Sequence, residues 1–256
     1  MTFLNTFLTV ISLTAFGAQT EHISASEDDI LEPTRHPVEF YSKAHSFMVN
    51  SEPFKNFTLI DSINFIDSLE DWEPPKELAQ RFPYYLSGFD DEDRPVWVTP
   101  IGEYNVRRVL EEGPEAAANL EKYAFQACLQ VLESMESRKA LGIEVEEIFL
   151  IADWEGLDIS QVAHLPTVIF SLRLFQTYSQ IITLALGQVV AINVSFAAEL
   201  ALNIARPVLG SLFQKTDIFG TDKARWSAAL RRMLPEDVIP NIYGGRKDYT
   251  PVKIYG

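Results

Sequence analysis

Two runs that are apolar on both faces constrain the fold of this chain most. Residues 147–152, EIFLIA, and residues 189–194, VVAINV, leave almost no polar alternation for a face that meets water. Strands of this kind lie inside parallel sheets that are covered by helices on both sides. A helical pattern at residues 166–178 separates the two runs, and this spacing implies right-handed crossovers. The sequence therefore predicts an α/β fold with a mostly parallel sheet.

The other patterns place short elements around these strands. Pro83 interrupts a short helix expected at residues 76–85, and Pro207 ends or kinks the helix that follows residue 196. The remaining expected elements are small helices within 38–69, a turn at 89–95, strands at 96–99 and 216–219, and helices at 114–138 and 222–233.

The helix after residue 196 divides into three sides. A polar stripe of Glu199, Asn203 and Arg206 runs along it, and the rest is apolar. The small side consists of Ala198, Ala201, Leu202, Ala205 and Leu209, and the bulky side consists of Phe196, Leu200, Ile204 and Val208. Such a helix either borders a cavity on one side and a membrane or partner on another, or is a core helix packed all round.

Charge and cysteine content exclude several classes. A net charge of -15 repels nucleic acid and anionic lipid surfaces, so we expect no nucleic-acid partner. One cysteine, Cys128, permits neither an intramolecular disulfide nor a cysteine-based zinc site. No other metal or cofactor motif is present in the sequence, and we expect neither group.

The N-terminal residues suggest a secretory signal. Residues 7–18 are apolar, of the right length, and end in small residues, although no basic residue precedes them. We expect a cleaved signal peptide and a secreted protein; an uncleaved apolar arm on a cytoplasmic protein is the alternative. On the secretory route, Asn56 lies in a glycosylation sequon.

Catalytic motifs are weak. Ser195 stands between a strand and a helix, as a hydrolase nucleophile does, but it lacks flanking glycines and a following histidine. Asp153, Glu155 and Asp158 follow a central strand, and we favour a capping and turn role for these carboxylates over a catalytic or metal-binding one. We therefore expect no enzyme, and so much apolar helix without catalytic groups points to an apolar ligand.

Five motifs occur in order along the chain: Trp72-Glu73-Pro74-Pro75, Asp90 with Arg94-Pro95-Val96-Trp97, Asp153-Trp154-Glu155-Gly156, Arg206-Pro207-Val208-Leu209, and Leu234-Pro235-Glu236 with Tyr243-Gly244-Gly245. In this order and spacing they resemble the CRAL-TRIO lipid-binding family, which includes phosphatidylinositol-transfer and tocopherol-transfer proteins. The first motif and the final KIYG look most similar to the supernatant protein factor, or tocopherol-associated, branch, without its C-terminal β-sandwich domain. The resemblance implies a parallel sheet that floors a lipid cavity, and a hydrophobic gate helix that opens against membranes.

Under this resemblance, Phe196, Leu200, Ile204 and Val208 face the membrane, and the small side of the same helix faces the lipid. The expected ligand-binding residues are Ala124, Cys128, Ile148, Leu150, Ala152, Leu172, Phe175, Ile182, Leu184, Leu186, Val189, Ala198, Ala201, Leu202, Ala205, Leu209 and Lys215. Ile182-Thr183-Leu184 replaces the Tyr-Pro-Glu of members that bind phosphatidylinositol, which argues against that headgroup.

The expected organisation is a signal peptide (1–18), a polar arm (19–37), a small helical region (38–80), the lipid-binding domain (81–248) and a C-terminal tail (249–256). The expected function is non-catalytic binding of one sterol, tocopherol-like isoprenoid or acyl lipid, and its transfer through transient membrane contact. The alternatives are a scaffold with a filled pocket that binds an unidentified protein and, less favoured, a serine hydrolase.

Overall fold

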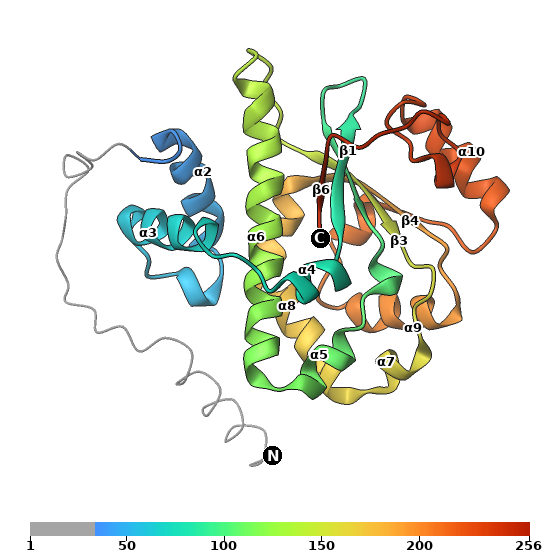
Figure 1. Ribbon diagram of the computed structural model, residues 1–256, viewed down its shortest axis with the longest axis horizontal. Coiled ribbons are helices and arrows are strands. Elements are labelled where there is room, and N and C mark those ends of the chain that lie inside the picture. The colour runs from blue at the N-terminus through green and yellow to red at the C-terminus, as the bar shows by residue number, and fades with distance from the viewer. Residues whose placement is uncertain (1–33) are drawn as a thin grey trace. The chain divides into compact units, whose positions relative to one another are not determined.

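The computed structural model describes residues 34–256, apart from the side chains of residues 179–182 and 184 (Figure 1). The predicted signal peptide, most of the polar arm and the side chains of Ile182 and Leu184 lie outside the described residues. Residues 35–256 form one compact unit, so the small helical region is part of the same unit as the sheet.

A six-stranded sheet in the order β5-β4-β3-β2-β1-β6 organises this unit. The parallel strands are β2 (Pro95–Thr99), β3 (Ile148–Asp153), β4 (Leu186–Ile192) and β5 (Thr216–Ile218). Strands β1 (Tyr84–Phe89) and β6 (Lys253–Tyr255) complete one edge in antiparallel pairing. The predicted α/β class with a mostly parallel sheet is confirmed.

One face of the sheet is sealed by the last helix. Val96, Phe149, Ile151 and Val190 project from the strands into one buried cluster, which Trp226 of helix α10 (Lys223–Met233) also enters. The cluster is closed by Leu230, Leu234, Val238, Ile239 and Tyr243. This face is a plain hydrophobic core, and α10 lies on the side of the sheet opposite to α6 (Figure 1).

Helices α6 (Pro114–Lys139) and α8 (Leu165–Ala185) lie beyond the other face. Trp97 of β2 anchors α6 to the sheet, because its indole Nε1 donates to Ser134 Oγ at 3.1 Å. An ion pair between Arg173 and Glu121, 2.6 Å from Nη2 to Oε2, joins α8 to α6. Pro114 begins α6 at a first-turn position, where its missing N–H costs no hydrogen bond.

The small helical region packs on α6 from outside the sheet. It contains α2 (Val38–Met48), the 3₁₀ turn η2 (Glu52–Phe54), α3 (Leu59–Glu70) and α4 (Lys76–Arg81). Thr58 and Asp61 form a capping box at the start of α3. Phe54 and Phe65 pack against Phe125 of α6, with ring centroids 5.5 and 5.2 Å apart.

The structure corrects several predicted boundaries. Tyr84 and Tyr85 belong to strand β1 rather than to the end of a short helix, and residues 106–112 form a further helix, α5 (Val106–Glu112). Helix α8 extends to Ala185 and leads directly into β4, which begins at Leu186. Residues 249–256 are not a separate tail, because β6 pairs with β1.

Candidate functional site

The site is built around helix α9 (Phe196–Ala205), between β4 and the 3₁₀ turn η4 (Leu212–Lys215). Ser195 caps the helix, its Oγ accepting from the Ala198 N–H at 3.4 Å, and Arg206 follows its last residue. Beyond the helix, the Arg206 guanidinium lies over the Phe213 ring, 4.5 Å from its centroid. The predicted helix and its end before Pro207 are confirmed.

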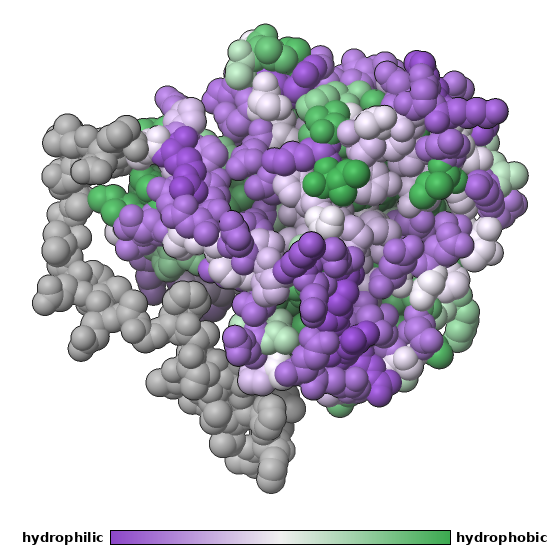
Figure 2. Space-filling model, viewed as in Figure 1, coloured by the Kyte–Doolittle hydropathy of each residue, from purple (hydrophilic) through white to green (hydrophobic). Residues whose placement is uncertain are grey.

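The two apolar sides of α9 have opposite surroundings. On the small side, Ala198 is fully buried, Ala205 and the following Leu209 are each 8% exposed, and Ala201 and Leu202 are half-buried. On the bulky side, Phe196 is 77% exposed and Leu200 is 38% exposed, while Ile204 and Val208 are half-buried. In Figure 2 hydrophobic residues reach the surface at the lower right, where Figure 1 places α9. The helix is therefore not a core helix packed all round.

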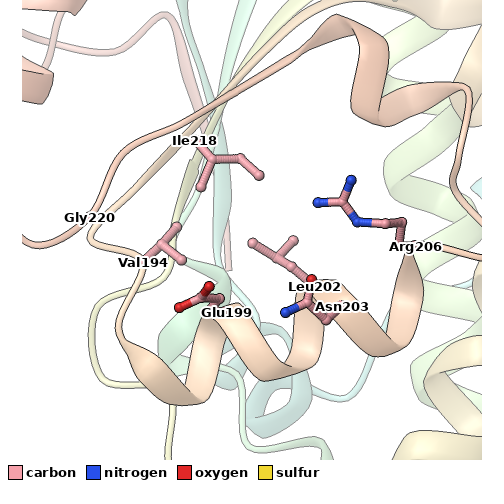
Figure 3. Close-up of a pocket in the computed structure, with 7 residues that line it drawn as sticks. All are labelled: Val194, Glu199, Leu202, Asn203, Arg206, Ile218 and Gly220. Atoms are coloured by element: carbon pink, nitrogen blue, oxygen red, sulfur yellow. The ribbon is translucent and has the colours of Figure 1, made fainter.

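A pocket of about 220 Å³ lies between α9 and the end of β5 (Figure 3). Leu202 and the polar stripe of α9 line one wall, and Ile218 lies across from them. The complete lining is Val194, Glu199, Leu202, Asn203, Arg206, Ile218 and Gly220. The sequence showed the polar stripe of Glu199, Asn203 and Arg206 but did not predict that it lines a pocket. Ile218 comes to lie opposite the stripe only because β5 pairs with β4.

The sheet beneath this helix presents the residues predicted to floor a cavity. Leu150 pairs with Val189 and Ala152 pairs with Ala191, so these four side chains share a face. Ile218 pairs with Ala191 in turn, which places the pocket on that same face. Trp97, whose indole bonds to α6, pairs with Leu150, so this is the face that α6 covers. The predicted floor residues therefore share the face of the sheet on which Ile218 lies across the pocket from Leu202 of α9.

The predicted contacts on the covering helices are mostly half-buried. Ala124 and Cys128 on α6, and Leu172 and Phe175 on α8, all keep some accessible surface, whereas Ile148 and Leu186 are buried. Burial raises the pKa of the Cys128 thiol to about 11. The thiol is therefore desolvated inside the fold, although the residue as a whole keeps some accessible surface.

Lys215, the predicted anionic contact, has partners within the protein. Its Nζ donates to Glu147 Oε1 at 2.9 Å and to the Leu186 carbonyl at 2.7 Å. These bonds hold η4 against the start of β4. As a ligand contact Lys215 stays a prediction, and a headgroup would have to replace one of these bonds.

Asp153 is engaged in a structural network. Its Oδ1 accepts from Asn193 Nδ2 and from the Glu155 N–H, both at 2.9 Å, and its Oδ2 accepts from the Tyr243 hydroxyl at 2.7 Å. Asn193 in turn accepts from the Trp226 indole at 3.1 Å. This buried carboxylate therefore fixes the end of β3 against α10, in line with a structural role.

The chain belongs to the CRAL/TRIO domain family, whose model matches residues 79–245. The family comprises lipid-binding and lipid-transfer domains. Protein real-time of Drosophila melanogaster is 22% identical over 206 residues, covering 80% of this chain and 30% of that protein. CRAL-TRIO domain-containing protein T23G5.2 of Caenorhabditis elegans is 23% identical over 180 residues, covering 69% of this chain. The chain spans less than a third of the length of these relatives, 30% and 24% respectively.

The crystal structure of Sfh5 superposes with a TM-score of 0.47 at 15% identity, covering 86% of this chain and 78% of that one. Within residues 34–256, no helix is at once long enough and apolar enough to cross a bilayer.

Proposed function

We propose that this protein binds one hydrophobic lipid between the sheet and its covering helices and exchanges that lipid with membranes, with α9 acting as the gate. The observation that carries the proposal is the division of α9, with Ala198 and Ala205 buried and Phe196 and Leu200 exposed to solvent. A soluble fold gains nothing by exposing two large apolar side chains on one helix, whereas contact with a bilayer removes them from water.

The floor residues support an apolar ligand. The face shared by Leu150, Ala152 and Val189 carries no charged group at these positions, and neither does the small side of α9. The ligand classes that this lining favours are sterols, isoprenoids and acyl lipids. A polar contact is also available, because the Tyr123 hydroxyl on α6 is buried and has no hydrogen-bond partner among the described residues.

A protein-binding scaffold is the second candidate, and the size of the pocket favours it. The pocket beside α9 has a volume of about 220 Å³. Pockets that hold drug-sized ligands are usually about 300–1,000 Å³. A lipid carrier must therefore enlarge this space by moving α9, whereas a scaffold leaves α9 where it is.

Lipid extraction separates the two candidates. The full chain is purified without detergent, extracted with organic solvent, and the extract is analysed by mass spectrometry. A carrier yields one lipid class in near-equimolar amount, or takes up a fluorescent sterol or fatty acid when it is purified empty. A protein that carries no lipid and takes up neither probe is not a lipid carrier, and the scaffold then stands.

A further inference from the structure

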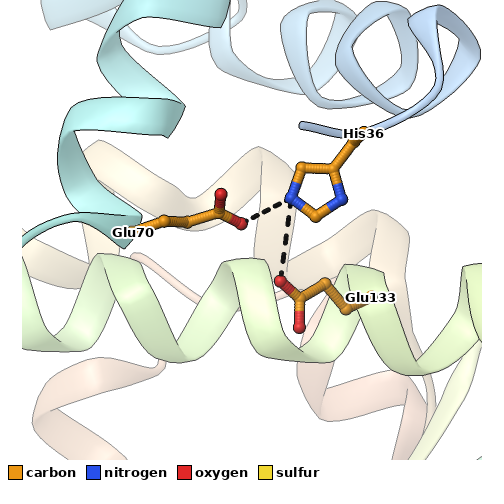
Figure 4. Close-up of side chains that lie close together, drawn as sticks. All are labelled: His36, Glu70 and Glu133. Carbon is orange, nitrogen blue, oxygen red and sulfur yellow. Dashed lines mark hydrogen bonds and ion pairs between the residues drawn. The ribbon is translucent and has the colours of Figure 1, made fainter. Parts of the chain in front are cut away.

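Three side chains with metal-binding groups meet where the small helical region packs on α6 (Figure 4). His36 precedes α2, Glu70 is the last residue of α3, and Glu133 lies on α6. His36 Nε2 is 2.6 Å from Glu70 Oε1 and 4.0 Å from Glu133 Oε1. One ligand atom from each residue lies within 4.8 Å of the others, and none of the three residues is fully exposed.

The three residues offer a donor set that zinc accepts. Neutral imidazole and carboxylate are ordinary Zn²⁺ ligands, at about 2.0–2.2 Å from the ion. Tetrahedral bonds of this length put ligand atoms about 3.3 Å apart, between the two distances that His36 Nε2 makes with the carboxylates. Glu133 Oε1 has to approach His36 Nε2 by about 0.7 Å, and Glu70 Oε1 has to move away from it by about 0.7 Å, shifts that these flexible side chains allow.

The surroundings also suit a cation. The side chains of Glu70 and Glu133 are only 9% and 30% exposed, so two carboxylates lie beside one imidazole with little access to water. Arg35 Nη1 donates to the other oxygen of Glu70 at 3.2 Å, which leaves Oε1 turned to His36. The His36 ring is held against Phe40, with centroids 4.4 Å apart. Such outer contacts orient the ligands of metal sites.

We propose that His36, Glu70 and Glu133 bind one divalent zinc ion, with a fourth position for water, and that the ion fastens α2 and α3 to α6. The site is independent of lipid binding, since it lies on the face of α6 that meets the helical region rather than the sheet. An imidazolium that bridges the two carboxylates is the competing arrangement, and it needs no metal.

Zinc titration of the full chain against a chromophoric zinc indicator tests the proposal. We expect one ion per chain, with affinity at least about tenfold weaker in His36→Ala and in Glu133→Gln. Zinc should also raise the melting temperature of the wild type and not that of either variant. The matched controls are His45→Gln, a second histidine of the same region, and Glu136→Gln, one turn along α6. Both controls should bind zinc as the wild type does.

Circular dichroism checks that each variant is folded before titration. If His36→Ala fails to fold, Glu133→Gln still tests the site, because glutamine keeps the shape of the glutamate side chain. A wild type that does not compete with the indicator overturns the proposal and leaves the bridging imidazolium. Zinc binding of unchanged affinity in Glu133→Gln also overturns the proposal, because the ion is then bound elsewhere.

Discussion

Removing the two exposed apolar side chains of α9 is the sharpest test of the gate. Phe196 is 77% exposed and Leu200 is 38% exposed. Full burial of such a side chain is worth about 1.5–3 kcal/mol, so the exposed fractions correspond to about 1.2–2.3 kcal/mol for Phe196 and about 0.6–1.1 kcal/mol for Leu200. At about 1.4 kcal/mol per tenfold, the Phe196→Ser/Leu200→Ser variant should bind vesicles about 20- to 270-fold more weakly.

The assay is flotation with phosphatidylcholine vesicles, whose surface has no net charge to repel an acidic protein. The control is Ile242→Ser/Val252→Ser, which removes side chains of residues that are 65% and 60% exposed elsewhere on the surface. The control should float as the wild type does. Equal flotation of the α9 variant and the wild type, or an equal loss in the control, would refute the reasoning, because adhesion would then not depend on this helix.

Three further predictions concern the frame of the site. Asp153→Ala leaves the Tyr243 hydroxyl and the Asn193 amide without their acceptor, so urea unfolding should show a loss of about 1–3 kcal/mol for each buried group left unpaired; an unchanged midpoint would contradict this. Ala198→Leu overpacks the fully buried side of α9 and should cost about 1–3 kcal/mol in thermal unfolding, whereas a neutral result would mean that this side has room. Cys128, with its pKa raised to about 11, should be alkylated about 100-fold more slowly at pH 8 than a thiol of pKa 9. Because the unfolded thiol loses its proton at lower pH than the folded one, the free energy of unfolding should fall as pH rises from 9 towards 11. Rapid labelling of the folded protein would contradict the burial of this thiol.

The sheet and α9 were predictable because their signals are local. Apolar runs such as 147–152 define buried strands by themselves, and Pro207 with the stripe beginning at Glu199 defines one helix and its end. The family motifs then gave the order of these parts along the chain, within the range 79–245 that the family model matches.

Elements that depend on distant pairing were not predictable. Strand β6 has three residues, and it is a strand because it pairs with β1, from the other end of the domain. Helix α8 continues through Ile181, Ile182 and Thr183, whose branched side chains have low intrinsic helix propensity, so tertiary context overrides the local preference.

The two sites at helix contacts escaped prediction for the same reason. Ile218 joins the pocket through its pairing with Ala191, and nothing in its own neighbourhood indicates this. His36, Glu70 and Glu133 follow no motif spacing, and three separate segments have to pack before they meet.

The energetics of the proposed gate depend on which side chains are exposed to water, and which enter the bilayer, when α9 moves outwards. Ser195 caps its first turn, and Arg206 over Phe213, together with the bonds of Lys215, holds the segment after it, so both ends are anchored. Swinging the helix outwards exposes alanines, each of which loses only about 0.8 kcal/mol for its one carbon. The same motion would carry Phe196 and Leu200 into the bilayer, where the exposed parts of the two side chains together gain about 1.8–3.4 kcal/mol. Under the proposed function, α9 would open at a membrane and stay closed in water, because its small side chains favour the closed state only weakly and its large ones favour the open state only inside a bilayer.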